Sequence, residues 1–410
     1  MKITGYSDTY QPTGSEIVIP ASETGLAETY HFGTTYNADN SVASQRMPST
    51  NGDLPAEALQ FDYNSFGLQS GLRTLYGGVE SSYVADTDYN ALAEVDQVEL
   101  HTGTGGRVYQ KYTRELETGR LTGIRTDRDS AAPNVLSDIQ YRYDNTGNVT
   151  KVADVASDPA DDTQCFAYDH LRRLSHAWTP SSDDCAATRS ATTLGGPAPY
   201  WRSWTYDSVG NRRTETVHTA VGNTTTTYNY PADGAPKAHS LTSTTGGQVG
   251  SYTYDETGNT LTRPSGSSGT QTLTWDFEGH LDTVTDSTGQ TSFVYDANGN
   301  RLIRRDPAGK TLYLPGQEIR YNAGTNTTTS TRYYSYNGAM IASRTATGLT
   351  WLAGDHHGTA GRLPRHPGPP ATSSTRPWPW AAHPYASRDS LGLGSHSEAA
   401  RGSATYRDTW

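Results

Sequence analysis

A short unit that recurs along the chain constrains its fold more than any other feature. The unit is an aromatic residue followed by Asp, two variable residues and Gly, usually with Asn after the Gly. The last three full copies start 21 and 20 residues apart, a period typical of repeat architectures. The copies comprise Tyr143, Asp144, Gly147 and Asn148; Tyr206, Asp207, Gly210 and Asn211; Tyr254, Asp255, Gly258 and Asn259; Trp275, Asp276 and Gly279; Tyr295, Asp296, Gly299 and Asn300; and, in a weaker copy, Tyr168 and Asp169.

Each part of the unit has a mechanical interpretation. A further apolar residue stands two places before each aromatic, so both side chains lie on one face of a strand. The Asp carboxylate can accept a hydrogen bond from the backbone N–H two residues on, and Gly supplies the left-handed conformation of a tight loop. An aliphatic residue restarts a strand after most copies. The unit therefore predicts strand, turn, strand. In the weaker copy, Arg172 stands where Gly is expected.

Composition agrees with many short strands. The chain has 27 Tyr against 6 Phe, only five Lys, and frequent Thr, Gly and Asn, which suits strands and turns better than helices. Looser copies appear near Tyr6, Phe61 and Tyr112, and a late hairpin near Tyr333. No stretch between residues 1 and 360 keeps a 3.6-residue apolar period. We expect an all-β array of antiparallel hairpins.

These repeats resemble the YD repeats of the Rhs proteins, which also form the shell of teneurins. The resemblance covers residues 1–360, is best over 139–305, and includes a late segment, 311–360, that resembles the start of the family's core-associated region. It implies part of a curved, hollow β-shell, whose cavity holds a C-terminal toxin in bacterial members.

The resemblance ends after Asp355-His356-His357-Gly358-Thr359-Ala360. Residues 361–410 hold seven of the 21 Pro and three of the 8 Trp, and the repeat disappears. We expect this tail to be disordered, and interpret it as a frameshifted or truncated end. Met1 falls inside a repeat, so we expect the chain to be a piece of a larger shell.

Little in the sequence indicates catalysis or a cofactor. Asp355, His356 and His357 could bind a metal, but adjacent strand residues point to opposite faces, which favours a strand-end turn. Asp306-Pro307-Ala308-Gly309 is similar to the family's cleavage motif, yet an ordinary Pro turn explains it better. The Asp residues of the repeats are equivalent to one another, unlike the unique carboxylate pair of a glycosidase. We expect no enzymatic activity.

Cys165 and Cys185 are the only cysteines. Neither has partners at zinc-binding spacing. A disulfide between them would stabilise the fold by about 3 kcal/mol in an oxidising environment, and the alternative is two half-buried thiols.

The leading functional hypothesis is a non-enzymatic scaffold whose partners are an effector or toxin cargo, or the remaining shell segments of a longer parent chain. The alternatives are a cell-surface carbohydrate-binding module, with a saccharide partner, and a decayed remnant without independent function. The net charge of −11 argues against nucleic-acid binding. No apolar stretch is long enough for a membrane span, and no signal peptide begins the sequence. We expect the parent protein to be secreted or on the cell surface, and this chain to be cytoplasmic if made alone.

Overall fold

The computed structural model describes residues 1–50, 53–102, 106–129, 132–156, 162–266, 269–358 and 360–362. Its regular elements in these ranges are all β-strands. The all-β prediction is therefore confirmed. None of the described segments forms a helix that could cross a membrane. We expect residues 361–410 to be disordered, but the residues beyond Arg362 lie outside the part of the chain that the structure describes.

The strands form two sheets that follow each other along the chain. The first sheet contains β1 (Lys2–Tyr6), β2 (Pro12–Val18), β3 (Thr29–Tyr36), β4 (Val42–Met47), β5 (Glu57–Tyr63), β6 (Gln69–Tyr76), β7 (Val79–Tyr89), β8 (Val95–His101), β9 (Arg107–Arg114), β10 (Leu121–Arg128), β11 (Val135–Tyr143), β12 (Val149–Asp154), β13 (Asp162–Tyr168), β14 (Leu174–Trp178), β15 (Trp201–Tyr206), β16 (Arg212–Thr219), β17 (Gly222–Asn229), β18 (Ser243–Gly246) and β19 (Gly250–Ser251).

The second sheet begins after one intervening residue, Tyr252. It contains β20 (Thr253–Tyr254), β21 (Thr260–Ser265), β22 (Gly269–Trp275), β23 (Leu281–Asp286), β24 (Gly289–Tyr295), β25 (Arg301–Asp306), β26 (Gly309–Leu314), β27 (Gln317–Asn322), β28 (Thr327–Tyr336), β29 (Ala339–Thr345), β30 (Gly348–Gly354) and β31 (Ala360–Arg362). Within each sheet every strand pairs antiparallel with the next one in the chain.

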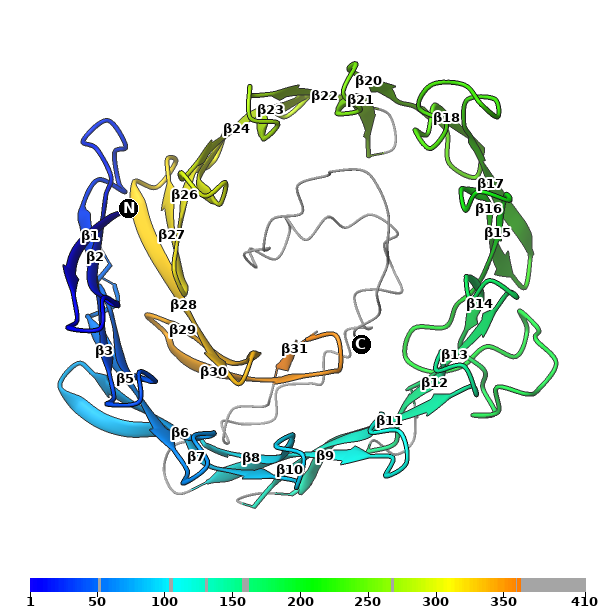
Figure 1. Cartoon of the computed structure of the whole chain (residues 1–410). Helices are drawn as coiled ribbons and strands as arrows, with labels where there is room; N and C mark the ends of the chain where they lie inside the picture. Colours follow the sequence, from blue (N-terminus) through cyan, green and yellow to red (C-terminus); the bar gives the residue numbers. More distant parts are fainter. Residues whose placement is uncertain are drawn as a thin grey trace.

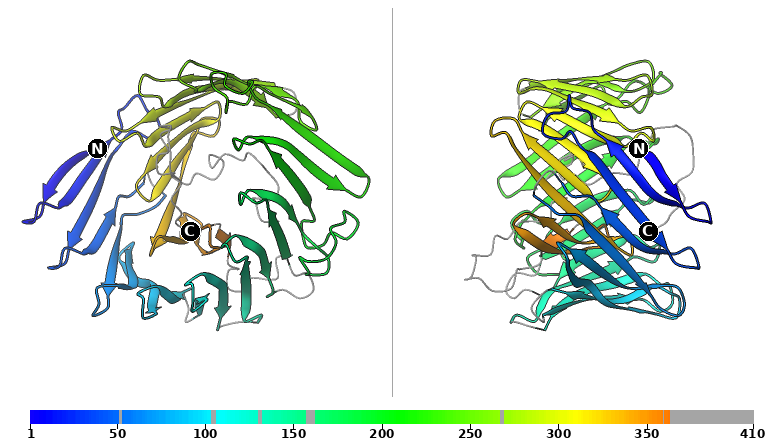
Figure 2. Two further views of the ribbon diagram at one scale, coloured as in Figure 1. Left: turned by 45° about the vertical axis from the view of Figure 1, so that its right-hand side comes forward. Right: turned by 90° about the vertical axis from the view of Figure 1, so that its left-hand side faces the viewer.

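The ribbon of hairpins winds into a ring and then overlaps itself. In Figure 1 the strands from β26 onward run inside the N-terminal strands, so the wall is double there and single elsewhere. The turned views show strands inclined to the ring axis and stacked side by side around it (Figure 2). The curved wall encloses a central space (Figure 1).

The two largest apolar cores lie between the two layers of this overlap. One joins Leu72 and Val84 of the outer layer to Tyr334 and Ile341 of the inner layer. The other joins outer-layer residues, such as Tyr30, to Leu312 and its neighbours in the inner layer. The single-layer part has only smaller clusters. A sheet one strand thick cannot bury both faces, so apolar burial concentrates where the ribbon doubles.

Residues two places before the motif aromatic face the interior of the ring. Phe61 precedes Tyr63 by two places and packs against the core shared with the inner layer. Thr87 precedes Tyr89 in the same way and its hydroxyl contacts that of Tyr336 at 2.7 Å. The equivalent positions elsewhere are Tyr141, Phe166, Trp204, Tyr252, Leu273 and Phe293.

The outer face is polar. Cross-strand threonine pairs lie on it, exposed and within hydrogen-bond distance, such as Thr205 with Thr214 at 2.6 Å and Thr274 with Thr283 at 2.7 Å. Each such pair stabilises the neighbouring strands by roughly 0.2–1 kcal/mol.

A β-bulge accompanies the motif aromatic in each copy. In the hairpin of β15 and β16, Thr205 pairs with Thr214 but Tyr206 pairs with Arg212, which leaves Arg213 unmatched. The same shift occurs in the other copies. Bulges bend and twist a strand pair, so their repetition along one edge helps to curve the wall.

Candidate functional site

The motif Asp residues lie in hairpin turns and hold those turns together. Asp144 Oδ1 accepts the backbone N–H groups of Thr146 at 2.9 Å and Asn148 at 3.0 Å, and its Oδ2 accepts the Asn148 side-chain amide at 2.8 Å. Burial alone would raise the pKa of Asp144, but hydrogen bonds from Asn148 and Thr146 outweigh it and hold the pKa at about 2. The carboxylate is therefore ionised, and it accepts hydrogen bonds from groups of its own turn.

The same pair of backbone bonds recurs in the other turns. Acceptors of the N–H groups two and four residues on are Asn64, Asn90, Asp169, Asp207, Asp255, Asp276 and Asp296. Because the strands alternate in direction, all these turns lie on one edge of the wall, which we call the motif rim. Adjacent motif turns are two strands, about 10 Å, apart. The repeated carboxylates are thus spread along the rim, each in its own turn.

The third residue after the Asp adopts a left-handed conformation whatever its identity. Gly147 has φ 93° and Gly210 has φ 96°. Arg172, in the weaker copy, has φ 61° and so takes the conformation that Gly takes elsewhere. A side chain in this region is strained, so the Arg is tolerated at a cost in stability of roughly 1 kcal/mol.

The motif aromatics join successive hairpins through their polar ends. Tyr168 Oη donates to the carbonyl of Val149, the first residue of the preceding β12, at 2.7 Å. We call each such bond a rung. The other rungs run from Tyr36 to Pro12, Tyr63 to Val42, Tyr89 to Gln69, Tyr143 to Leu121, Tyr206 to Leu174, Tyr254 to Leu241, Trp275 to Thr260 and Tyr295 to Leu281.

A further rung has a donor that is not aromatic. Arg114 occupies the aromatic position at the end of β9 and donates from Nη1 to the carbonyl of Val95, the first residue of β8, at 2.8 Å. Phe has no donor for this bond, so Tyr is favoured over Phe at the rung positions. Sequence reasoning placed the aromatics on a strand face but missed the rung. The one available signal was the excess of Tyr over Phe.

A buried polar cluster crosses the overlap between the layers. Glu57 of β5 accepts from four side chains: Arg332 Nη1 and Tyr334 Oη at 2.7 Å on Oε2, and Tyr83 Oη at 2.7 Å and Thr74 Oγ1 at 2.5 Å on Oε1. Glu57 and Arg332 are fully buried. Burial, followed by the nearby Glu57 charge, raises the pKa of Tyr83 to about 12, so this hydroxyl stays a donor.

Arg332 makes further hydrogen bonds to groups around it. Its Nη2 donates to the Pro48 carbonyl at 2.8 Å, and its Nε to Gln317 Oε1 at 3.2 Å. Arg344 donates to the hydroxyls of Tyr334 at 3.0 Å and Tyr83 at 2.9 Å. A second charged cluster also joins the two layers. In it Glu23 forms ion pairs with Arg305 and Lys310. Sequence analysis identified none of these residues.

Glu318 in the inner layer carries a perturbed carboxyl group. Burial raises its pKa to about 7, against the opposing hydrogen bond of Tyr333 and the charge of Arg301. Its Oε1 is buried without a hydrogen-bond partner. Perturbed carboxyls are candidates for function, but a titrating structural group explains this one equally.

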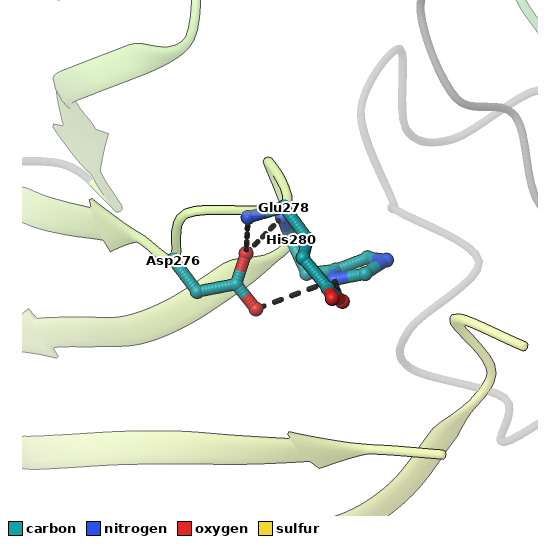
Figure 3. A group of neighbouring side chains, drawn as sticks. All are labelled: Asp276, Glu278 and His280. Carbon is teal, nitrogen blue, oxygen red and sulfur yellow. Dashed lines mark hydrogen bonds and ion pairs between the residues drawn. The ribbon is translucent and has the colours of Figure 1, made fainter. Parts of the chain in front are cut away.

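Asp276, Glu278 and His280 form a group of possible metal ligands in one motif turn (Figure 3). Asp276 Oδ1 already accepts two backbone N–H groups, and its Oδ2 lies 3.2 Å from His280 Nδ1. The imidazole stacks on Tyr295 with ring centroids 4.6 Å apart. Asp276 and Glu278 are exposed and the turn is built like its neighbours, so we interpret the group as structural.

Asp355, His356 and His357 lie in the turn after β30. His356 packs edge-on against Tyr141, with ring centroids 4.6 Å apart, and its backbone N–H donates to Tyr141 Oη at 3.3 Å. Burial lowers the pKa of His356 to about 4, so the imidazole is neutral. Asp355 Oδ1 accepts the N–H of His357 at 2.9 Å. These contacts dock the turn onto the outer layer.

Asp306 lies at the end of β25 and accepts two hydrogen bonds from Arg320 at 2.8 Å, one on each carboxylate oxygen. Pro307 and Ala308 then form the turn into β26, and Asp306 Oδ1 caps it through the Ala308 N–H at 3.0 Å. The segment forms an ordinary hairpin turn.

Cys165 and Cys185 form a disulfide. It fastens a long insertion between β14 and β15, in which Asp183 also pairs with Lys151 at 2.7 Å. Beside this insertion is a pocket of about 550 Å³ lined mainly by apolar and aromatic residues. Trp201 and His218 in its lining stack with centroids 3.9 Å apart.

Antiparallel hairpins linked by rungs and closed by an overlap define a curved β-shell wall. No family model matches the chain. It is 28% identical over 320 residues to toxin subunit YenC1 of Yersinia entomophaga, covering 70% of this chain and 32% of the relative. It is 26% identical over 293 residues to toxin subunit YenC2 of the same organism, covering 63% and 29%.

Among solved structures, the chain is similar to TcdB2-TccC3, with a TM-score of 0.67 and 20% identity over 88% of this chain and 20% of that one. The TcdB2-TccC3-Cdc42 structure gives a TM-score of 0.66 at 19% identity, over 88% and 19%. The chain thus spans about a third of the length of the toxin subunits and a fifth of the crystallised chain. These solved structures share the fold of this chain.

Proposed function

We propose that this chain is a wall segment of a toxin-associated β-shell and acts as a non-enzymatic scaffold. The observation that carries the proposal is the closure of the ribbon on itself through the buried contact of Glu57 with Arg332, which turns a row of hairpins into an enclosing wall (Figure 1). Similarity to toxin subunits supports the association with a toxin.

The interior is the proposed functional surface. In the single-layer arc, inward positions carry part-exposed aromatics such as Trp204, Tyr252 and Phe293. Such a surface can hold an extended polypeptide through its side chains, so the proposed cargo is a polypeptide effector, as the Rhs resemblance implies. The disulfide of Cys165 with Cys185 supports a parent protein that is secreted or on the cell surface.

Photo-crosslinking tests where a cargo lies. An unfolded reporter polypeptide is fused to the C-terminal end of the full chain, and a photoreactive amino acid replaces Trp204, which faces inward, or the adjacent Thr205, which faces outward. The proposal expects crosslinks to the reporter from position 204 and at least tenfold fewer from position 205. Equal yields from both faces, or none from position 204, would contradict it.

The proposal that the chain has no enzymatic activity rests on carboxylates that already accept hydrogen bonds in the structure. Each motif Asp is used by its own turn, and Asp306 is paired with Arg320. Screening the purified chain for nuclease, protease and glycosidase turnover tests this part. A turnover abolished by one substitution, for example Glu318→Gln, would establish an enzyme.

The alternative of saccharide binding has one observation in its favour, the pocket with the stacked Trp201 and His218. Aromatic rings offer apolar faces to sugar rings. A glycan array separates the two functions, because a container needs no saccharide preference whereas a binding module shows one that Trp201→Ala removes.

A further inference from the structure

Three side chains on neighbouring strands of the single-layer wall are joined by hydrogen bonds. Oγ of Ser203 in β15 lies 2.8 Å from Nε2 of His218 in β16. Nδ1 of the same imidazole lies 3.1 Å from Oδ1 of Asn223 in β17. Ser203 precedes the inward-facing Trp204, so the group lies on the outer face of the wall. We call these three residues the relay.

The asparagine of the relay determines which ring nitrogen carries the proton. An amide oxygen only accepts hydrogen bonds, so the ring proton of His218 is on Nδ1 and is donated to Asn223. Nε2 then has a free lone pair and accepts the hydrogen bond of the Ser203 hydroxyl. A hydroxyl that donates to the free nitrogen of an oriented imidazole is the arrangement that activates a serine as a nucleophile.

The imidazole of the relay is also held in place by packing. The His218 ring stacks on Trp201, with ring centroids 3.9 Å apart and an angle of 19° between the two planes. Trp201 is held in turn, because its Nε1 donates to Nδ1 of His176 at 3.4 Å. A base whose ring is fixed by stacking keeps its nitrogen directed at the hydroxyl before any ligand binds.

The relay borders the pocket of about 550 Å³ beside the disulfide-fastened insertion. His218 belongs to both, since it lines the pocket together with Trp201. Much of the remaining lining is apolar and includes Leu194, Pro199 and Val217. A short apolar group fits such a lining, so a ligand that places one there brings its polar end close to the imidazole.

The backbone around Ser203 limits what the relay can do. Ser203 pairs with His176 of β14 on one side and with Thr216 of β16 on the other, so its N–H is used by the sheet. Serine hydrolases direct such N–H groups at the oxyanion, and losing one donor costs roughly 10²–10³ in rate. A positioned general base contributes roughly 10²–10⁴. The relay is therefore equipped to form a covalent bond but not to turn over rapidly.

We propose that Ser203 is a site of covalent acylation by activated esters with a short apolar acyl group. The Ser203 oxygen bonds to the ester carbonyl carbon while Nε2 of His218 takes the hydroxyl proton. The bond between that carbon and the alcohol oxygen breaks, and the proton leaves with the alcohol. Hydrolysis of the new ester is slow for want of the sheet-bound N–H, so the reaction stops after one equivalent. A single acylation is not turnover, and the proposal is independent of the scaffold role.

Reaction of the full chain with para-nitrophenyl butyrate tests the proposal. We expect one equivalent of para-nitrophenolate to be released, and peptide mapping should place one butyryl group on Ser203. Ser44 is the matched control within the same chain, because its hydroxyl is bonded across strands to Thr35 at 2.7 Å instead of to a histidine. Ser203 should react roughly 10²-fold faster than Ser44, the lower end of what a general base contributes.

Two comparisons separate an activated serine from an exposed hydroxyl. Asn223→Ala should slow acylation of Ser203 by roughly tenfold, whereas Asn223→Asp keeps an acceptor for Nδ1 and should retain the rate. Para-nitrophenyl acetate should react about tenfold more slowly than the butyrate, since each CH₂ buried in the pocket contributes about fourfold.

Three results would overturn the proposal. They are equal labelling of Ser203 and Ser44, a butyryl group on His218 instead of Ser203, and equal rates in the two Asn223 variants. Release that continues beyond one equivalent would also overturn it, because the relay would then support turnover.

Discussion

Glu57 and Arg332 form a fully buried ion pair, with 2.7 Å between Oε2 and Nη1, although 275 residues separate them in the chain. Glu57 lies in the outer layer of the overlap and Arg332 in the inner layer. The pair therefore fixes where the end of the ribbon meets its beginning. Tyr83, Tyr334 and Thr74 complete the acceptor capacity of the carboxylate.

Removing one partner of this pair should destabilise the protein strongly. In Arg332→Met the Glu57 carboxylate stays buried without its counter-ion, and we expect a loss of about 3–5 kcal/mol in the free energy of unfolding. Urea denaturation measures it. The control is Arg73→Met, which removes an exposed ion pair with Asp62 and should cost less than about 1 kcal/mol. Equal losses in the two variants would show that Arg332 does not hold the overlap.

The rungs should each contribute measurably. Tyr168→Phe keeps the ring but removes the donor to the Val149 carbonyl, and we expect a loss of about 1 kcal/mol in the free energy of unfolding. Tyr10→Phe is the matched control, because Tyr10 lies exposed in a turn. Thermal and urea unfolding of both variants measure the difference. If Tyr168→Phe were as stable as the unmodified chain, the rung would have no energetic role.

Arg172→Gly should stabilise the protein. Arg172 has φ 61°, and Gly relieves the strain of a left-handed backbone, which outweighs the extra entropy of the unfolded chain. We expect a gain of about 0.5–1 kcal/mol. The reverse substitution in an equivalent turn, Gly210→Ala at φ 96°, should lose about 1 kcal/mol. Urea unfolding of both variants tests whether the free energy of unfolding changes in opposite directions. A lower stability of Arg172→Gly would contradict the conformational explanation.

Glu318 should make stability depend on pH. Its pKa is raised from 4.5 to about 7 in the folded protein, so folding favours the protonated form. The contribution of Glu318 to the free energy of unfolding is therefore fully present below pH 4.5. It is lost as the pH rises from 4.5 through 7. After allowance for solvent screening, the loss is about 1–2 kcal/mol.

Glu318→Gln should remove that decrease and be more stable than the unmodified chain at pH 8. Unfolding measured from pH 5 to pH 8 gives the comparison, with the exposed Glu256→Gln as control. His356 acts in the opposite sense, because its lowered pKa makes stability fall as the pH drops from 6.5 towards 4. An unchanged pH profile in Glu318→Gln would assign the dependence to other groups.

Local features of the wall could be predicted from the sequence, because each depends on residues close together in the chain. The order aromatic, Asp, Gly predicts a strand followed by a tight turn, and the all-β fold follows from repeating it. The rungs depend on the register between neighbouring hairpins, which the pattern leaves open. Tyr168 and Val149, for example, belong to different repeats.

The overlap lay beyond sequence reasoning for a different reason. Glu57 and Arg332 meet only after the whole ribbon has wound around, and neither stands in a motif. How far a strand ribbon curves is a sum of small twists and bulges, so no local pattern shows where its two ends meet. The raised pKa of Glu318 likewise follows from the burial of its carboxyl group in the inner layer.

Small-angle X-ray scattering of the full chain tests most directly whether the repeats build a closed, hollow wall. We expect the pair-distance distribution of a ring, with few vectors at the short distances that a filled interior would supply. Arg332→Met should shift it towards a longer, open shape. A distribution of a solid globule, or of an extended ribbon for the unmodified chain, would contradict the closed wall.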